Sequence, residues 1–85
     1  MERKEIQEKL YNIVSEIIGT PKEELTLKTT FVHDLSADSL TIVDIMSKCE
    51  DVFQINISDE QAENMKSVGD AVEYIHTRLS GSKKK

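Results

Sequence analysis

The chain has 85 residues, a formal charge of −5, an apolar fraction of 38%, only 5% aromatic residues and no Trp. A chain of this length has enough apolar surface for one modest core, which excludes a second domain. The scarcity of aromatic residues favours helices packed through Ile, Leu and Val over a β-sandwich. Apolar runs of only a few residues, and four charged residues directly after Met1, argue against a membrane span and a signal peptide.

Negative charge is concentrated in the middle of the chain. Residues 34–63 contain eight acids and one base, Lys48, and therefore carry −7. Because the whole chain carries −5, the remaining residues sum to +2. This asymmetry argues against nucleic acid or an anionic membrane as partner and favours a protein with a basic patch. A solvated acidic surface without a partner is the alternative that charge alone leaves open.

The first half of the chain predicts one helix followed by a long loop. Apolar residues at helical spacing, with Gly19 and Pro21 as stop signals, predict a helix over about residues 3–18. Its inward side chains are Ile6, Leu10, Ile13, Val14 and Ile17. Residues 19–37 lack a steady period, and a loop of this length usually has a functional reason. The apolar residues expected to anchor it are Leu25, Leu27, Phe31 and Leu35.

A second helix is predicted from Asp38, a favourable N-cap, to about Phe53. At 100° per residue, one face collects five residues that we expect in the core. These are Ile42, Ile45, Met46, Cys49 and Phe53. The opposite face, expected to be exposed, combines two apolar residues with polar ones: Leu40, Val43, Asp44 and Ser47.

Two more helices complete the predicted bundle. Ser58 and Gln61 form a capping box that starts a short third helix, and Ser67 caps a fourth. The inward residues of these two helices are Ala62, Met65, Val68, Ala71, Val72, Ile75 and Leu79. The expected fold is an all-α four-helix bundle with three longer helices, one short third helix and a long first loop. We expect the domain to span residues 1–80 and residues 81–85 to form a disordered basic tail.

Ser39 occupies the first position of the predicted second helix. Backbone N–H groups lack partners there, and the positive end of the helix dipole favours an anion such as a phosphate ester on this side chain. Taken alone, Asp38 and Ser39 are also ordinary residues for a helix start.

The flanking residues carry a more specific signal. The segment Phe31-Val-His-Asp-Leu-Ser-Ala-Asp-Ser-Leu-Thr-Ile-Val-Asp44 closely resembles the attachment region of bacterial acyl carrier proteins of fatty-acid synthesis. The similarity extends from about Ile6 to Leu79. It implies that Ser39 receives 4′-phosphopantetheine from coenzyme A through a separate holo-carrier-protein synthase, a phosphopantetheinyl transferase. The thiol of this arm would carry acyl groups as thioesters, while other enzymes perform the chemistry.

The resemblance also implies a face for partner proteins. Basic docking patches of fatty-acid synthesis enzymes would contact Asp38, Leu40, Val43, Asp44 and Ser47. Some positions depart from the family pattern. Ser36 stands where glycine is usual, Cys49 replaces a leucine and Ser58 a proline, while Thr41 and Lys48 weaken the negative field that attracts basic enzymes.

A pocket for the acyl chain is expected between the second and third helices, with its entrance near Ile57. A core of aliphatic and Met side chains rather than aromatic rings should open slightly, because Met is flexible. The residues expected to form this pocket are Ile42, Ile45, Met46, Ile57, Met65 and Ile75. We expect the carrier to act as a cytoplasmic monomer.

Other functions fit the sequence less well. An enzyme would need Ser39 as nucleophile, His33 or His76 as base and Asp34 or Asp38 to orient that base, but no nucleophile elbow or Gly-rich oxyanion segment is present. An acidic adaptor protein without a prosthetic group and a D-alanyl or peptidyl carrier remain as alternatives.

The only cysteine, Cys49, lies on the core face of the predicted second helix. A single cysteine permits neither an internal disulfide nor a paired metal site, and we expect no metal. A reducing cytosol is the natural compartment for such a chain. We interpret Cys49 as a buried apolar filler rather than a redox group.

Overall fold

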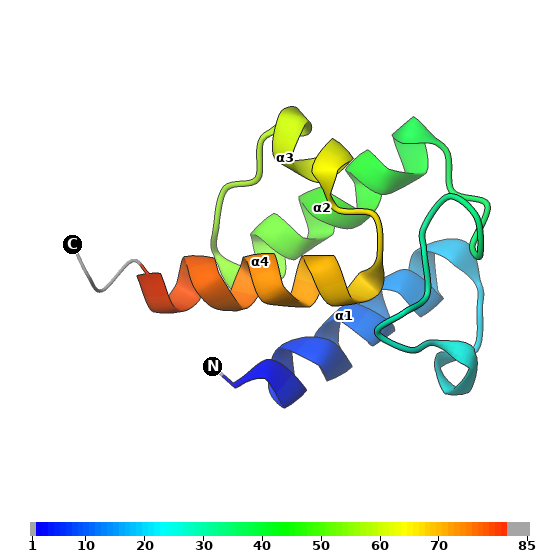
Figure 1. Ribbon diagram of the computed structural model, residues 1–85, viewed down its shortest axis with the longest axis horizontal. Coiled ribbons are helices and arrows are strands. Elements are labelled where there is room, and N and C mark those ends of the chain that lie inside the picture. The colour runs from blue at the N-terminus through cyan, green and yellow to red at the C-terminus, as the bar shows by residue number, and fades with distance from the viewer. Residues whose placement is uncertain (1, 82–85) are drawn as a thin grey trace.

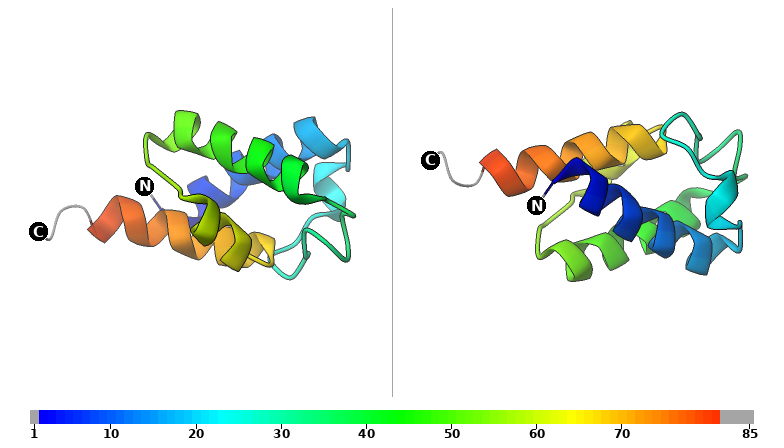
Figure 2. Two further views of the ribbon diagram at one scale, coloured as in Figure 1. Left: turned by 90° about the horizontal axis from the view of Figure 1, so that it is seen from above. Right: turned by 90° about the horizontal axis from the view of Figure 1, so that it is seen from below.

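The structure is a computed structural model that describes residues 2–81, and it confirms the predicted all-α bundle. The elements are α1 (Arg3–Ile18), the 3-10 helix η1 (Lys22–Glu24), α2 (Ser39–Phe53), α3 (Asp59–Asn64) and α4 (Val68–Gly81). Helix α1 packs against both α2 and α4, while the short α3 packs against α2 (Figure 1). The start of α1 and the end of α4 lie at one end of the molecule, opposite the long loop (Figure 2). No helix within residues 2–81 is long and apolar enough to cross a membrane.

The predicted helix boundaries are confirmed by their caps. Asp38 Oδ1 accepts a hydrogen bond from the Thr41 backbone N–H at 2.9 Å and so caps α2. Ser58 and Gln61 form the predicted capping box of α3. The Ser67 hydroxyl accepts from the Asp70 N–H at 3.1 Å at the start of α4. Helix α4 extends through Gly81, one residue beyond the predicted domain boundary, and residues 82–85 of the predicted tail lie outside the described residues.

One apolar cluster forms the core, and it draws on every long helix and on the loop. Its side chains are Ile6, Leu10, Ile13, Val14, Leu25, Phe31, Ala37, Ile45, Met46, Cys49, Phe53, Ile57, Ala62, Met65, Val68, Ala71, Val72 and Ile75. Phe53 is buried in it, as predicted from the inner face of the second helix, and the loop residue Phe31 is buried with it.

Three residues predicted to face inward are not fully buried. Ile42 is half-buried, because it borders an open pocket between α2 and α3 instead of meeting a packed neighbour there. Ile17 is exposed and Leu79 half-buried, since both lie in the last turn of their helices at the margin of the core.

Backbone hydrogen bonds hold the long loop against the segment that leads into α4. The Phe31 N–H donates to the Lys66 carbonyl at 3.0 Å, and the Val68 N–H donates to the Thr29 carbonyl at 2.8 Å. An antiparallel bridge pairs Thr30 with Ser67 between these two bonds. The loop that precedes Ser39 is therefore held by residues at the entry to α4, which come later in the chain.

Leu27 was expected to anchor this loop through its side chain, and that expectation is wrong. The side chain is 43% exposed, whereas the Leu27 carbonyl accepts a hydrogen bond from the Gly69 N–H at 2.8 Å. A Cβ atom at Gly69 would lie 2.7 Å from this carbonyl oxygen, closer than two such atoms can approach. The contact between loop and helix thus requires glycine at position 69. Leu25 and Phe31 are buried as predicted, and Leu35 is half-buried.

Candidate functional site

Ser39 is an exposed residue at the first position of α2. The hydrogen bonds from Thr41, the backbone N–H above all, lower the pKa of the Asp38 carboxyl and keep it ionised as the cap. Because the cap is supplied by Asp38, the hydroxyl of Ser39 is not needed to start the helix. An anionic group attached to this hydroxyl would meet the positive end of the α2 dipole.

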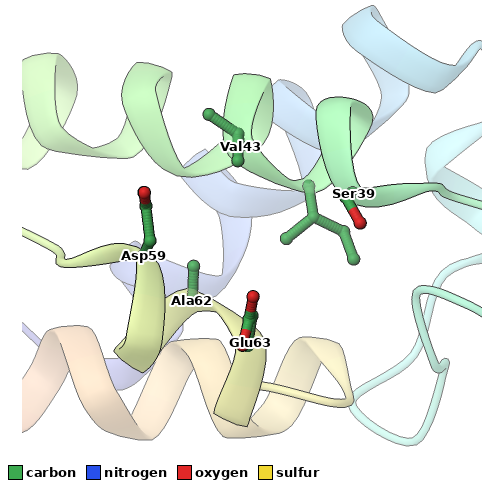
Figure 3. Close-up of a pocket in the computed structure, with 6 residues that line it drawn as sticks. Ser39, Val43, Asp59, Ala62 and Glu63 are labelled. Atoms are coloured by element: carbon green, nitrogen blue, oxygen red, sulfur yellow. The ribbon is translucent and has the colours of Figure 1, made fainter.

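A pocket of about 130 Å³ lies between α2 and α3, with Ser39 at one end (Figure 3). Helix α2 contributes Ser39, Ile42 and Val43, and α3 contributes Asp59, Ala62 and Glu63. Its apolar part is formed by Ile42, Val43 and Ala62. Two carboxylates form the remainder of its α3 side.

The predicted acyl pocket coincides only partly with this cavity. Ile42 lines it, while the other five predicted residues, Ile45, Met46, Ile57, Met65 and Ile75, are buried in the core and are not among its lining residues. Ile57 therefore does not border the opening, contrary to expectation, because its side chain packs inward from the loop before α3. Val43, Asp59, Ala62 and Glu63 also line the pocket, and of these only the inward direction of Ala62 follows from helical spacing.

The outer face of α2 is exposed as predicted. Leu40 and Val43 are 75% and 40% exposed, and Asp38, Asp44 and Ser47 are exposed beside them. An apolar pair of this kind, flanked by carboxylates, suits a protein partner with apolar contacts inside a basic patch.

Helix α3, which carries one side of the pocket, is tied to α4 by polar side chains. The Tyr74 hydroxyl donates to Gln61 Oε1 at 2.5 Å. Arg78 Nη1 donates to the Tyr74 hydroxyl at 2.8 Å and to the Asn56 carbonyl at 3.0 Å. On the α2 side, Glu50 Oε2 accepts from the Ile57 N–H at 2.6 Å. These bonds set the position of α3 and of the loop that leads into it.

The residues of the alternative catalytic triad are not brought together. Asp34 accepts hydrogen bonds from the N–H and the hydroxyl of Thr30, and Asp38 accepts one from Thr41, so each carboxylate caps its own turn. His33 is exposed on the loop, whereas His76 lies on α4. Within residues 2–81, no hydrogen bond joins either carboxylate to His33 or His76.

Cys49 is fully buried in the core. Burial, reinforced by the negative charge of Glu50, raises the pKa of the Cys49 thiol to about 12. The reactive thiolate is therefore scarce at neutral pH, which supports the interpretation of Cys49 as an apolar filler.

Known proteins are similar to this chain in sequence and in the arrangement of their helices. The family model described as phosphopantetheine attachment site matches residues 8–75. An acyl carrier protein of Exiguobacterium sibiricum is 40% identical over 79 residues, covering 93% of this chain and 100% of the relative. One from Amoebophilus asiaticus is 42% identical over 76 residues, covering 89% and 95%. The solved structure of an acyl carrier protein from Enterococcus faecalis matches with a TM-score of 0.78 and 35% identity, over 92% of this chain and 99% of that one.

Proposed function

Because this chain belongs to the acyl carrier protein family, whose members carry acyl groups on covalent 4′-phosphopantetheine, we propose that Ser39 is the attachment residue. The observation that supports this most directly is the exposed Ser39 hydroxyl at the start of α2, beside a pocket with an apolar wall. The dipole of α2 stabilises the phosphodiester in this position. As a carrier, the protein presents acyl groups to enzymes and has no catalytic activity of its own.

The attachment is tested by incubating the unmodified protein with coenzyme A and a phosphopantetheinyl transferase, followed by intact-mass analysis. We expect the wild type to gain one arm and Ser39→Ala to gain none. Ser36→Gly is the matched control, because it removes the neighbouring serine and suits the left-handed backbone of that residue, at φ 55°. An unchanged mass for the wild type, or a full gain in Ser39→Ala, would contradict the assignment.

The exposed face of α2 is the proposed docking surface for the transferase and for fatty-acid synthesis enzymes with basic patches. Its residues are Asp38, Leu40, Val43, Asp44 and Ser47. The support is their exposure and the charge of −7 on residues 34–63. Electrostatic attraction of this kind raises association rates and is screened by salt.

Charge reversal tests this surface. Asp44→Lys is expected to weaken binding to such an enzyme at low salt, with a smaller loss at high salt. Glu8→Lys makes the same charge change on the exposed face of α1 and should have little effect. An equal loss for both variants would show that net charge, rather than this face, controls binding.

The pocket beside Ser39 is the proposed entrance for an acyl chain that leaves water. Its volume of about 130 Å³ is close to that of an engineered cavity of about 150 Å³ that holds benzene. Longer chains would require the packed core to move, and Met46 and Met65 are its most adaptable buried side chains. Burial contributes about 0.8 kcal/mol per methylene, less the cost of moving the core.

Thermal melts of carriers loaded with short, medium and long acyl chains test this entrance, because a ligand that binds only the folded state raises its stability. Ala62→Leu should reduce the gain by filling the pocket, whereas its unacylated form should still fold. Acylated and unacylated forms that melt together would show that the chain stays in solvent.

We also propose that the carrier is a cytoplasmic monomer in fatty-acid synthesis. Light scattering tests the monomeric state, and the acyl groups on host-purified protein separate this role from D-alanyl transfer.

A further inference from the structure

The pocket between α2 and α3 has two chemically different sides. Helix α2 presents Ile42 and Val43, while α3 presents Ala62 between two acids, Asp59 and Glu63. The acids are four residues apart and so share one face of α3. Figure 3 shows both carboxyl groups directed from α3 toward α2.

No basic side chain balances these two acids at the pocket. Its six lining residues include no Lys, Arg or His. The only ion pair found in residues 2–81 joins Arg3 to Glu73, between α1 and α4. Helix α3 contains no base, and the one base of α2, Lys48, is exposed and does not line the pocket. A group that enters the pocket therefore meets an apolar wall and two negative charges that no lining base balances.

The effect of these charges on an acyl group depends on the chemistry of the end of the group that enters the pocket. A neutral hydrocarbon gains free energy when its methylenes leave water. A chain that ends in a carboxylate must lose hydration of that charge and approach two like charges, which is unfavourable unless a cation is present. We propose that Asp59 and Glu63 make the pocket selective by charge, so that neutral acyl groups enter and acyl groups ending in a carboxylate stay in solvent. This inference rests on the proposed entry of acyl chains beside Ser39.

The selection has a consequence for delivery. A neutral chain held in the pocket is shielded until an enzyme draws it out. An acyl group with a free carboxylate remains outside the carrier, where an enzyme can bind it without first opening α3. The same carrier therefore presents the two classes of acyl group in two different ways.

Two acyl groups that differ by a terminal carboxylate test the proposal. The carrier is loaded at Ser39 with a hexanoyl or a hexanedioyl group, and the Tm of each form is compared with that of the unacylated arm. We expect the hexanoyl group to raise the Tm by about 4–8 °C and the hexanedioyl group to leave it nearly unchanged. In the double variant Asp59→Asn with Glu63→Gln, the difference in Tm between the hexanoyl and hexanedioyl forms should become smaller.

Glu60→Gln is the matched control, because Glu60 is an exposed acid of α3 that does not line the pocket. It should leave the difference between the hexanoyl and hexanedioyl forms as large as in the wild type. Equal stabilisation by both groups in the wild type, or a difference that persists in the double variant, overturns the charge selection. If neither group raises the Tm, the proposed entry of acyl chains itself is wrong.

Discussion

The hydroxyl of Tyr74 lies 2.5 Å from Oε1 of Gln61 and joins α4 to α3. Since α3 has only six residues, it is too short to be stable without tertiary contacts. The Arg78 guanidinium bonds to the same hydroxyl and to the Asn56 carbonyl, so α4 holds both α3 and the loop before it. The pocket wall is therefore positioned by a helix that does not line the pocket.

Tyr74→Phe should loosen α3 while leaving the bundle folded. The substitution keeps the ring but removes the hydroxyl, and loss of such a hydrogen bond costs about 1 kcal/mol. We expect faster hydrogen exchange of the α3 amides and a small fall in the free energy of unfolding. Tyr11→Phe is the control, because its hydroxyl bonds to Gln7 within α1. Equal protection of α3 in both variants would show that Tyr74 does not hold this helix.

Gly69→Ala should destabilise the protein, although Gly to Ala within a helix usually stabilises by about 0.5–1 kcal/mol. The added Cβ would lie 2.7 Å from the Leu27 carbonyl oxygen, so loop or helix must shift. Overpacking of this kind costs about 1–3 kcal/mol. Chemical denaturation gives the sign directly, and a more stable Gly69→Ala would show that the loop gives way freely.

Ser36→Gly should stabilise the fold. Ser36 has φ 55°, a left-handed conformation that costs a residue with a Cβ atom about 1–2 kcal/mol. Glycine removes this strain, but it also makes the unfolded chain more flexible, which favours unfolding. The net gain in the free energy of unfolding should be about 1 kcal/mol. Equilibrium unfolding of Ser36→Gly and Ser36→Ala measures it, since only glycine should help. A gain of the same size with alanine would contradict strain as the cause.

The Asp38 cap should make stability depend on pH in the acidic range. Its pKa is lowered in the folded state from the ordinary value of 3.8, chiefly by the Thr41 N–H. The ionised cap thus stabilises the fold above pH 3.8, and this contribution is lost as the pH falls through the lowered pKa. Asp38→Asn retains a capping side chain without charge. Denaturation at a series of pH values gives the free energy of unfolding of the wild type and of Asp38→Asn. The advantage of the wild type over Asp38→Asn should decrease as the pH falls from 3.8 through the lowered pKa. A difference between the two proteins that does not change with pH would contradict the linkage.

Local signals explain what the sequence predicted correctly. Asp38, Ser58 and Ser67 cap their helices through residues three positions away, so each boundary is encoded within a few residues. The exposure of Leu40 and Val43 follows from the angular period of a single helix. Such features need no knowledge of how helices are placed relative to one another.

The features that the sequence did not predict depend on how the helices and the loop are placed relative to one another. The half-burial of Ile42 and the presence of Asp59 and Glu63 at the pocket follow from the position of α3 beside α2, which helical periodicity does not encode. The exposed side chain of Leu27 has a similar cause, because its backbone rather than its side chain meets Gly69. The three-residue η1 is too short to show any period.

The hydrogen bonds between the long loop and the start of α4 also determine when, during protein synthesis, the loop before Ser39 can become ordered. The ribosome makes Ser39 before residues 66–69, whose backbone groups pair with residues 27–31. A nascent chain that ends before α4 therefore has its serine but not the ordered loop that precedes it. We expect a transferase to act poorly on such a chain, so that only a completed domain leaves the ribosome ready to be loaded.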